Sequence, residues 1–271
     1  TEKIAVEAAR DLTGGLARYS SVPSRNPQGL RDTVMSKKGQ YDALSPVLGE
    51  MLPQSFFAQA DPDSVLEAMQ KIETPTIVLK PEKGRFSNKI LIGSKDDIEQ
   101  QLSDYTSAYT SSDGLVVVQS YIEDVNSGFA PSIKGLTPTD KELMLRQGVK
   151  EIRVHVIDGK PFLVHGKVSA QGASTQAGNS YVFFDQESIP SDVIVNASKA
   201  AELLHKGTKS QDSYLAVDIT PSGSTIVEVN GRKQGSITSD LCASPEPHNA
   251  WVTALSEKLA AMAERSDGER V

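Results

Sequence analysis

The stretch 214–230 constrains the fold most strongly, because two alternating apolar runs flank a Pro-Ser-Gly-Ser turn. This pattern predicts a β-hairpin. A slip of one residue would exchange the two faces of a strand, so the alternation sets the register. It pairs Asp218 with Glu228 and places Gly223 at the centre of an odd-numbered loop. The expected apolar face consists of Leu215, Val217, Ile219, Val227 and Val229.

The opposite face of this hairpin is polar and carries Asp218, Glu228 and Asn230. Side chains directly opposite one another in a sheet have Cβ atoms about 5 Å apart, so these groups form one compact set. Two carboxylates and an amide supply the hard oxygen ligands that Mg²⁺ prefers when it also binds substrate phosphates. The hairpin therefore predicts a magnesium site, with an ordinary solvated polar face as the alternative interpretation.

Composition indicates an ordinary globular protein of 271 residues, 38% of them hydrophobic and 23% charged. A net charge of −7 argues against a dedicated nucleic-acid surface, although a local basic patch can still bind phosphates. The single Cys242 excludes an intrachain disulfide and a cysteine-rich metal site. No apolar run reaches the ~20 residues of a membrane span, and residues 1–12 lack the apolar core of a signal peptide. We therefore expect a cytoplasmic protein without a membrane partner.

The first half of the chain has the periodicities of an α+β lobe. Residues 1–36 are expected to be an N-terminal extension or the remnant of a preceding domain, with a candidate helix at 4–18 and a loop at 20–29. The expected helices that follow are 41–51, 62–72 and 95–109. Asp61 is placed to cap the second of these helices, and Ser94 opens the third. The expected strands are 54–58, 76–80, 89–93 and 115–122.

A second hairpin is expected at 150–157 and 161–170, after a long polar connection at 123–147. A three-residue loop would give a core face of Ile152, Val154, Val156, Phe162 and Val164. The opposite face would carry Glu151, Arg153, His155, His165 and Lys167. Two histidines on one face can bind a metal ion, but the neighbouring arginine and lysine would repel a cation. We therefore interpret this face as a phosphate-facing surface.

The remaining segments complete a second lobe. Residues 171–180 are rich in Gly, Ser and Gln and are expected to form a flexible lid. Helices are expected at 191–205 and 249–264, and the last six residues should be a frayed tail at 266–271.

Several motifs occur in a characteristic order along the chain. They are Lys80-Pro81, a loop with Gly84, Gln119-Ser120-Tyr121-Ile122-Glu123, Glu151-Ile152-Arg153, Lys167, Asp218 and Glu228-Val229-Asn230. This ordered set, over about residues 37–265, resembles the ATP-grasp superfamily. The resemblance is to its carboxylate–amine ligases, such as the ribosomal-protein glutamate ligases and tubulin tyrosine ligases. It implies an α+β fold in which lobes at 37–122 and 148–265, with largely antiparallel sheets, sandwich the nucleotide.

The resemblance also implies which residues bind ATP. Lys80 corresponds to a lysine that binds the phosphates and the adenine side, and either Lys37 or Lys38 corresponds to an earlier phosphate lysine. The phosphate loop would contribute Gly84 and Ser87. The hinge between the lobes would meet adenine through Gln119, Tyr121 and Ile122. Glu123, or alternatively Asp124, would accept hydrogen bonds from the ribose.

The chemical roles follow from the same resemblance. Arg153 and Lys167 would face the transferring phosphoryl group, and Arg232 would meet an acidic substrate. One or two Mg²⁺ ions, or Mn²⁺ in their place, would be held by Asp218, Glu228 and Asn230. The implied reaction forms an amide or peptide bond between a small-molecule or peptide carboxylate and an amine, through an acyl phosphate. Positioned charge does most of the work in such a reaction, so no side-chain nucleophile is required.

Two alternatives share the implied ATP site: a small-molecule kinase, and a nucleotide-binding module without activity. Three features depart from the family pattern. The loop 83–89 has one glycine where relatives have several, and Asn230 is not followed by proline. Only about 36 residues precede the first nucleotide lysine, where many relatives carry a substrate-binding domain. Substrate identity is therefore expected to depend on a missing segment, an oligomeric partner, or the loops 123–147 and 171–190.

Overall fold

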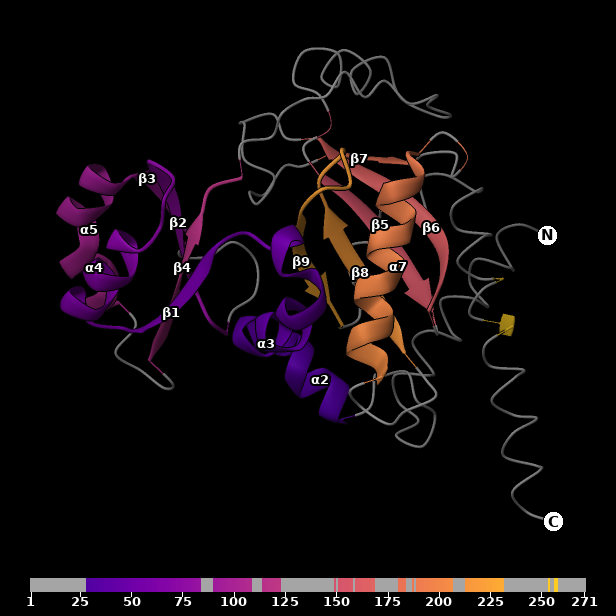
Figure 1. The fold of residues 1–271 in the computed structure, drawn as a ribbon, viewed down its shortest axis with the longest axis horizontal. Helices are drawn as coiled ribbons and strands as arrows, with labels where there is room; N and C mark the ends of the chain where they lie inside the picture. The colour runs from indigo at the N-terminus through magenta and orange to yellow at the C-terminus, as the bar shows by residue number, and fades with distance from the viewer. Residues whose placement is uncertain are drawn as a thin grey trace, which may run out of the picture.

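The computed structural model describes residues 28–83, 90–108, 114–122, 149, 151–157, 159–168, 180–183, 187, 189–206, 213–231, 253 and 256–257. Its strands form two antiparallel sheets that lie side by side, each covered by helices (Figure 1). This arrangement confirms the expected α+β fold class with largely antiparallel sheets.

The first sheet has the strand order β1-β4-β2-β3. Its strands are β1 (Ser55–Gln59), β2 (Thr76–Pro81), β3 (Leu91–Ser94) and β4 (Leu115–Ser120). The helices α4 (Pro62–Gln70) and α5 (Lys95–Ser107) cover one face of it. Both begin at the expected caps, because the side chains of Asp61 and Ser94 accept hydrogen bonds from the backbone of the first turn.

Alternation along the strands gives this sheet one apolar face and one mixed face. The apolar face packs with α4 and α5 into a core that includes Val65, Met69, Ile77, Leu79, Ile98, Val116 and Val118. The mixed face carries Lys80, Val117 and Gln119, which line a cleft beside the second sheet. Strand periodicity thus separates the residues that stabilise this lobe from those that line the cleft.

The second sheet has the strand order β7-β6-β5-β8-β9. Its strands are β5 (Glu151–Ile157), β6 (Lys160–Val168), β7 (Ser180–Phe183), β8 (Tyr214–Ile219) and β9 (Ile226–Asn230). The helix α7 (Ser191–Lys206) packs on it, as expected for 191–205. Gly223, in the β8–β9 turn, has φ of 73°. A Cβ at this position would lie 2.8 Å from the backbone nitrogen of Val193 in α7, so the close contact requires glycine.

Two further helices, α2 (Gln28–Met35) and α3 (Lys37–Leu48), lie at the junction of the two sheets (Figure 1). Leu44 and Leu48 of α3 belong to the core of the second sheet, although α3 precedes the first sheet in the chain. A 3₁₀ turn (Gly49–Met51) extends α3, so the helix expected at 41–51 ends where predicted but begins earlier, at Lys37. Because α2 begins at Gln28, the loop expected at 20–29 is wrong at its last two residues. The expected lobe boundaries stay a prediction.

The predicted registers of both hairpins are confirmed at the residues of their polar faces. Asp218 pairs with Glu228, and Arg153 pairs with His165. Each hairpin also contains a bulge that the alternation did not predict. In β9 the extra residue is Val227, so Ile226 takes the expected core position of Val227, and the loop 220–225 is even-numbered.

The bulge in β6 likewise moves one residue away from its expected place on the core face. His155 pairs with Leu163 and Val156 with Pro161, which leaves Phe162 as the extra residue. The ring of Phe162 lies 5.9 Å from that of His155, so its expected position on the core face is wrong.

Several predictions concern residues outside the described part of the chain. They are the helix 4–18, the connection 123–147, all of the lid 171–180 except Ser180, which begins β7, most of the helix 249–264 and the tail 266–271. Within the described part, no helix combines the length and the apolar character that crossing a bilayer requires.

Candidate functional site

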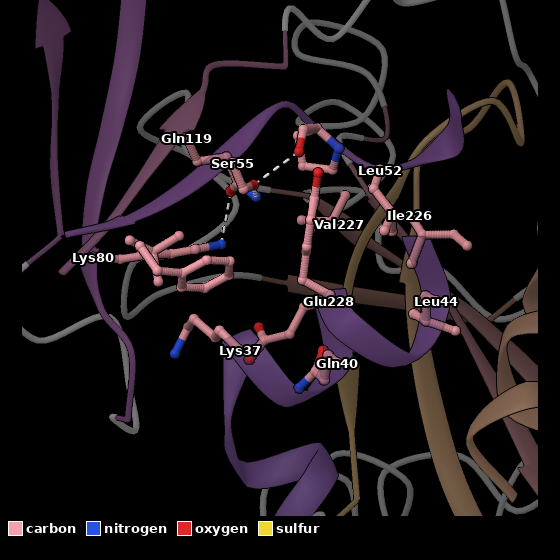
Figure 2. A pocket seen from close by; sticks show the side chains of 14 residues that line it. Lys37, Gln40, Leu44, Leu52, Ser55, Lys80, Gln119, Ile226, Val227 and Glu228 are labelled. Carbon is pink, nitrogen blue, oxygen red and sulfur yellow. Dashed lines mark hydrogen bonds between the residues drawn. The ribbon is translucent and has the colours of Figure 1, made fainter. Parts of the chain in front are cut away.

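A cleft lies where the two sheets meet α3 (Figure 2). The first sheet contributes Ser55, Phe57, Lys80, Val117 and Gln119. Helix α3 and the turn after it contribute Lys37, Gln40, Tyr41, Leu44, Leu52 and Pro53. The strand β9 contributes Ile226, Val227 and Glu228. The cleft therefore brings together four of the predicted site residues, each from a different helix or strand: Lys37, Lys80, Gln119 and Glu228.

A chain of hydrogen bonds holds Lys80 in this cleft. Its Nζ donates to Oε1 of Gln119 at 2.7 Å, and Nε2 of Gln119 donates to Oγ of Ser55 at 2.9 Å. Ser55 Oγ in turn donates to the carbonyl oxygen of Pro53 at 2.8 Å (Figure 2). Since a carbonyl oxygen can only accept, the direction of every bond in the chain is determined. The side chain of Gln119 therefore positions Lys80, a role that the resemblance did not imply.

The charge of Lys80 depends on its surroundings in the cleft. Burial lowers the pKa of Lys80 to about 8. The carboxylate of Glu228 opposes this shift, whereas the ammonium group of Lys37 adds to it. These three groups therefore interact electrostatically across the cleft. Two cations and one carboxylate suit a ligand that carries phosphates together with a divalent metal ion.

The N-terminus of α3 is tied to the end of β2. Ser36 caps α3 by accepting a hydrogen bond from Gly39 N at 2.9 Å, and its hydroxyl donates to the carboxylate of Glu82. Lys37 Nζ lies 3.4 Å from the backbone oxygen of Glu82. Lys38 instead forms an exposed ion pair with Asp42. Of the two alternative phosphate lysines, the structure places Lys37 on the cleft.

The predicted metal-binding face is preorganised by an ion pair. Arg153 holds the carboxylate of Asp218 through contacts of 2.5 Å (Nε to Oδ1) and 2.6 Å (Nη2 to Oδ2). Asn230 Nδ2 donates to the same carboxylate at 3.1 Å. Burial would lower the pKa of Arg153, but Asp218 outweighs it, and Glu151 and Glu228 also raise that pKa. The guanidinium group is therefore charged, and it faces a carboxylate rather than the cleft.

The donor set fits a magnesium ion in its chemistry. Glu228 lines the cleft opposite Asp218, and Asn230 supplies an amide beside both. Among the described residues, no three His, Cys, Asp or Glu side chains form a metal-binding group. A metal ion here would therefore need the amide oxygen of Asn230, or ligand oxygens such as phosphates, to complete its coordination.

The two histidines of the second sheet form a buried pair. His155 Nε2 and His165 Nδ1 are 3.2 Å apart, and both side chains are at most 1% exposed. One of these two nitrogens donates to the other, with the direction set by the tautomers of the rings.

The structure does not bring every predicted residue to the cleft. Tyr121 and Ile122 follow β4 and are not among the cleft residues. The backbone of Lys167 lies opposite Glu151, but its side chain is outside the described part. Also outside it are Gly84, Ser87, Glu123, Asp124 and Arg232.

Among the residues at or beside the cleft that were not predicted from the sequence, three have polar side chains that make hydrogen bonds there: Gln40, Ser55 and Glu82. Ser55 lies in a predicted strand, where alternation gives it the same face as Phe57. Glu82 directly follows Lys80-Pro81. Its acidic side chain so close to a lysine could have indicated a local contact. Gln40 carried no such signal, because a polar residue within a helix is usually exposed.

Comparison with known proteins places this geometry in a structural class. No family model and no curated protein sequence matches the chain. Its structure is similar to D-cycloserine synthetase DcsG, with 17% identity and a TM-score of 0.59 over 94% of this chain and 80% of that one. It is also similar to D-alanine–D-alanine ligase from Bacillus anthracis, with 16% identity and a TM-score of 0.56 over 96% and 77% of the two chains.

A third similar structure is an ADP complex of N5-carboxyaminoimidazole ribonucleotide synthetase, with 15% identity and a TM-score of 0.53. The match covers 83% of this chain and 51% of that chain, so the protein spans about half of that enzyme's length. It spans 62% of the B. anthracis ligase in its ATP complex. At these identities the likeness concerns the fold. The two antiparallel sheets, and the similarity over most of the chain, show that this protein has the ATP-grasp fold.

Proposed function

We propose that the protein is an ATP- and Mg²⁺-dependent ligase that joins a carboxylate to an amine through an acyl phosphate. The observation that carries this proposal is the cleft, in which Lys37, Lys80 and Glu228 meet between the sheets of an ATP-grasp fold. The similar D-alanine–D-alanine ligase is named as a ligase and is complexed with ATP. This supports the same nucleotide in the present cleft.

The residues of this chain supply binding and orientation. Lys37 and Lys80 would bind the phosphates of ATP, together with Gly84 and Ser87 of the predicted phosphate loop. Asp218, Glu228 and Asn230 would hold Mg²⁺, whose charge, when bound, offsets that of the phosphates. Adenine and ribose would contact the hinge residues Gln119, Tyr121, Ile122 and Glu123. Arg153 orients Asp218, which leaves Lys167 and Arg232 as the proposed cations for the phosphoryl group and an acidic substrate.

The proposed reaction has two steps. A carboxylate oxygen of the substrate attacks the γ-phosphorus of ATP, and the bond to ADP breaks. The amine nitrogen then attacks the acyl carbon, phosphate leaves, and the nitrogen loses a proton. A free carboxylate resists attack by an amine, which is why its oxygen must first become a good leaving group. Holding both reactants in one cleft supplies much of the rate enhancement.

Phosphate release distinguishes this ligase from a kinase with the same ATP site. A screen of amino acids and acidic peptides, suggested by the resemblance to glutamate and tyrosine ligases, should give ADP and free phosphate only with a carboxylate substrate. Hydroxylamine in place of the amine should trap the acyl phosphate as a hydroxamate. A stable phosphorylated product without free phosphate would identify a kinase. ATP binding without turnover of any acceptor would favour a binding module.

A further inference from the structure

Helix α3 lies along the outer edge of β9, the last strand of the second sheet in the described part of the chain. The side-chain amide of Gln40 makes this contact. Its Oε1 accepts from Val229 N at 2.9 Å, and its Nε2 donates to Val229 O at 2.8 Å. Nε2 also donates to Val34 O in α2 at 2.6 Å. Gln40 thus takes the place of a neighbouring strand at Val229.

Val229 lies between two of the predicted metal ligands. Its side chain is buried in the core, so the flanking Glu228 and Asn230 project from the opposite face. The bulge at Val227 interrupts strand pairing immediately before this site. Beyond the bulge only three residues of β9 pair with β8. The bonds from Gln40 therefore restrain β9 within the short segment after the bulge, where only these three residues pair with β8.

The same helix also carries a cation of the cleft. Lys37 precedes Gln40 by three residues, so both lie on one side of α3 and both line the cleft. The first turn of α3 is joined through Ser36 to Glu82, which follows Lys80 by two residues. One helix therefore connects the lysines of the cleft to the strand that carries Glu228.

We propose that Gln40 is a positioning residue for the metal-binding face. By holding β9 at Val229, it sets the distance between Glu228 and the lysines of the cleft. This inference rests on the proposed ATP and Mg²⁺ site. A buried amide that bonds both backbone groups of one residue resists displacement, because its loss leaves a buried N–H and C=O without partners.

The test compares Gln40→Met with a matched control, Gln54→Met. Gln54 also uses both ends of its amide, although its bonds are exposed and reach two residues: it donates to Lys71 O at 3.2 Å and accepts from Glu73 N at 3.0 Å. It lies in the first lobe and is not among the cleft residues. The measured quantity is the MgCl₂ concentration that half-saturates ATP binding. It is determined by calorimetry on the full chain.

Loss of a group that orients metal ligands typically weakens metal binding ~10–100-fold. We expect a rise of that size in the half-saturating MgCl₂ concentration of Gln40→Met. ATP binding without metal should change by less than about threefold, because Lys37 and Lys80 remain. Gln54→Met should lower the unfolding temperature without changing the MgCl₂ requirement. An equal MgCl₂ requirement in wild type and Gln40→Met would overturn the role of Gln40 but not the proposed metal site.

Two further measurements keep the outcomes distinct. If wild type binds ATP with no dependence on MgCl₂, the proposed metal site fails, and the role of Gln40 fails with it. If Gln40→Met does not fold, Gln40→Glu replaces it. A neutral glutamic acid has one donor and one acceptor, so it can keep both bonds to Val229. Its MgCl₂ requirement, relative to wild type at the same pH, should rise as the carboxyl group ionises; a constant ratio would overturn the inference.

Discussion

Arg153 and Asp218 lie directly opposite each other on β5 and β8, and two nitrogens of the guanidinium group donate hydrogen bonds to the carboxylate. The Asp218 side chain is 1% exposed and that of Arg153 is 10% exposed, so the pair is almost completely removed from water. Such a pair is costly to break on one side, because the remaining charge stays buried. The predicted metal ligand Asp218 is therefore held in place by a protein cation.

The first prediction concerns this pair. Arg153→Met should lower the free energy of unfolding by about 3–5 kcal/mol, since it leaves a buried carboxylate without its cation. MgCl₂ should restore more stability to this variant than to wild type, because a bound divalent cation would replace the lost charge. Urea unfolding with and without MgCl₂ measures both effects. Lys71→Met, which removes an exposed ion pair with Glu67, is the control and should show neither. An equal response to MgCl₂ in Arg153→Met and wild type would argue against metal binding at Asp218.

The second prediction concerns Glu228, the predicted metal ligand that lines the cleft. ATP with MgCl₂ should raise the unfolding temperature of wild type more than ATP with a chelator, because a ligand that binds only the folded state stabilises it. Glu228→Gln keeps the size of the side chain but removes its charge, so most of the metal-dependent rise should disappear. Differential scanning fluorimetry measures this. An unchanged MgCl₂ response in the variant would refute the assignment of Glu228.

The third prediction follows from the pKa of Lys80, which burial lowers to about 8. Below this pH the ammonium group is charged and attracts phosphates, so ATP affinity should be nearly constant. Above it the free protein loses the proton, and affinity should fall by up to about tenfold per pH unit. Lys80→Arg keeps its charge over the whole range, because an arginine stays protonated, and should remove this dependence. Titration calorimetry between about pH 7 and pH 9.5 checks the result; parallel profiles for both proteins would exclude Lys80 as the titrating group.

The fourth prediction concerns the cap of α3. Ser36→Ala removes the hydroxyl that accepts from Gly39 N and donates to Glu82, which should cost about 1–2 kcal/mol of stability. It should also weaken ATP binding, since the first turn of α3 carries Lys37. Ser94→Ala removes an equivalent cap from α5, away from the cleft, and should lower stability without affecting ATP. Equal ATP affinities in the two variants would show that the Ser36–Glu82 contact does not position the cleft.

The sequence by itself determined the local structure of this protein. Alternation of period two was sufficient to pair Asp218 with Glu228 and Arg153 with His165. The helix caps at Asp61 and Ser94 were also predicted correctly from the sequence. These features depend on residues close together in the chain, and a slip in register would expose a whole apolar face to water, so few alternatives compete.

Only the tertiary structure decided how these elements meet. Gln40 and Val229 are 189 positions apart, and Arg153 and Asp218 are 65 apart, so no local periodicity reports either contact. The bulges at Phe162 and Val227 also escaped prediction, because each inserts one residue that simple alternation does not anticipate. Arg153 shows the physical reason most clearly. Its face was readable from alternation, but its partner depended on which strand lies beside β5, and burial then made the nearest carboxylate the favoured contact.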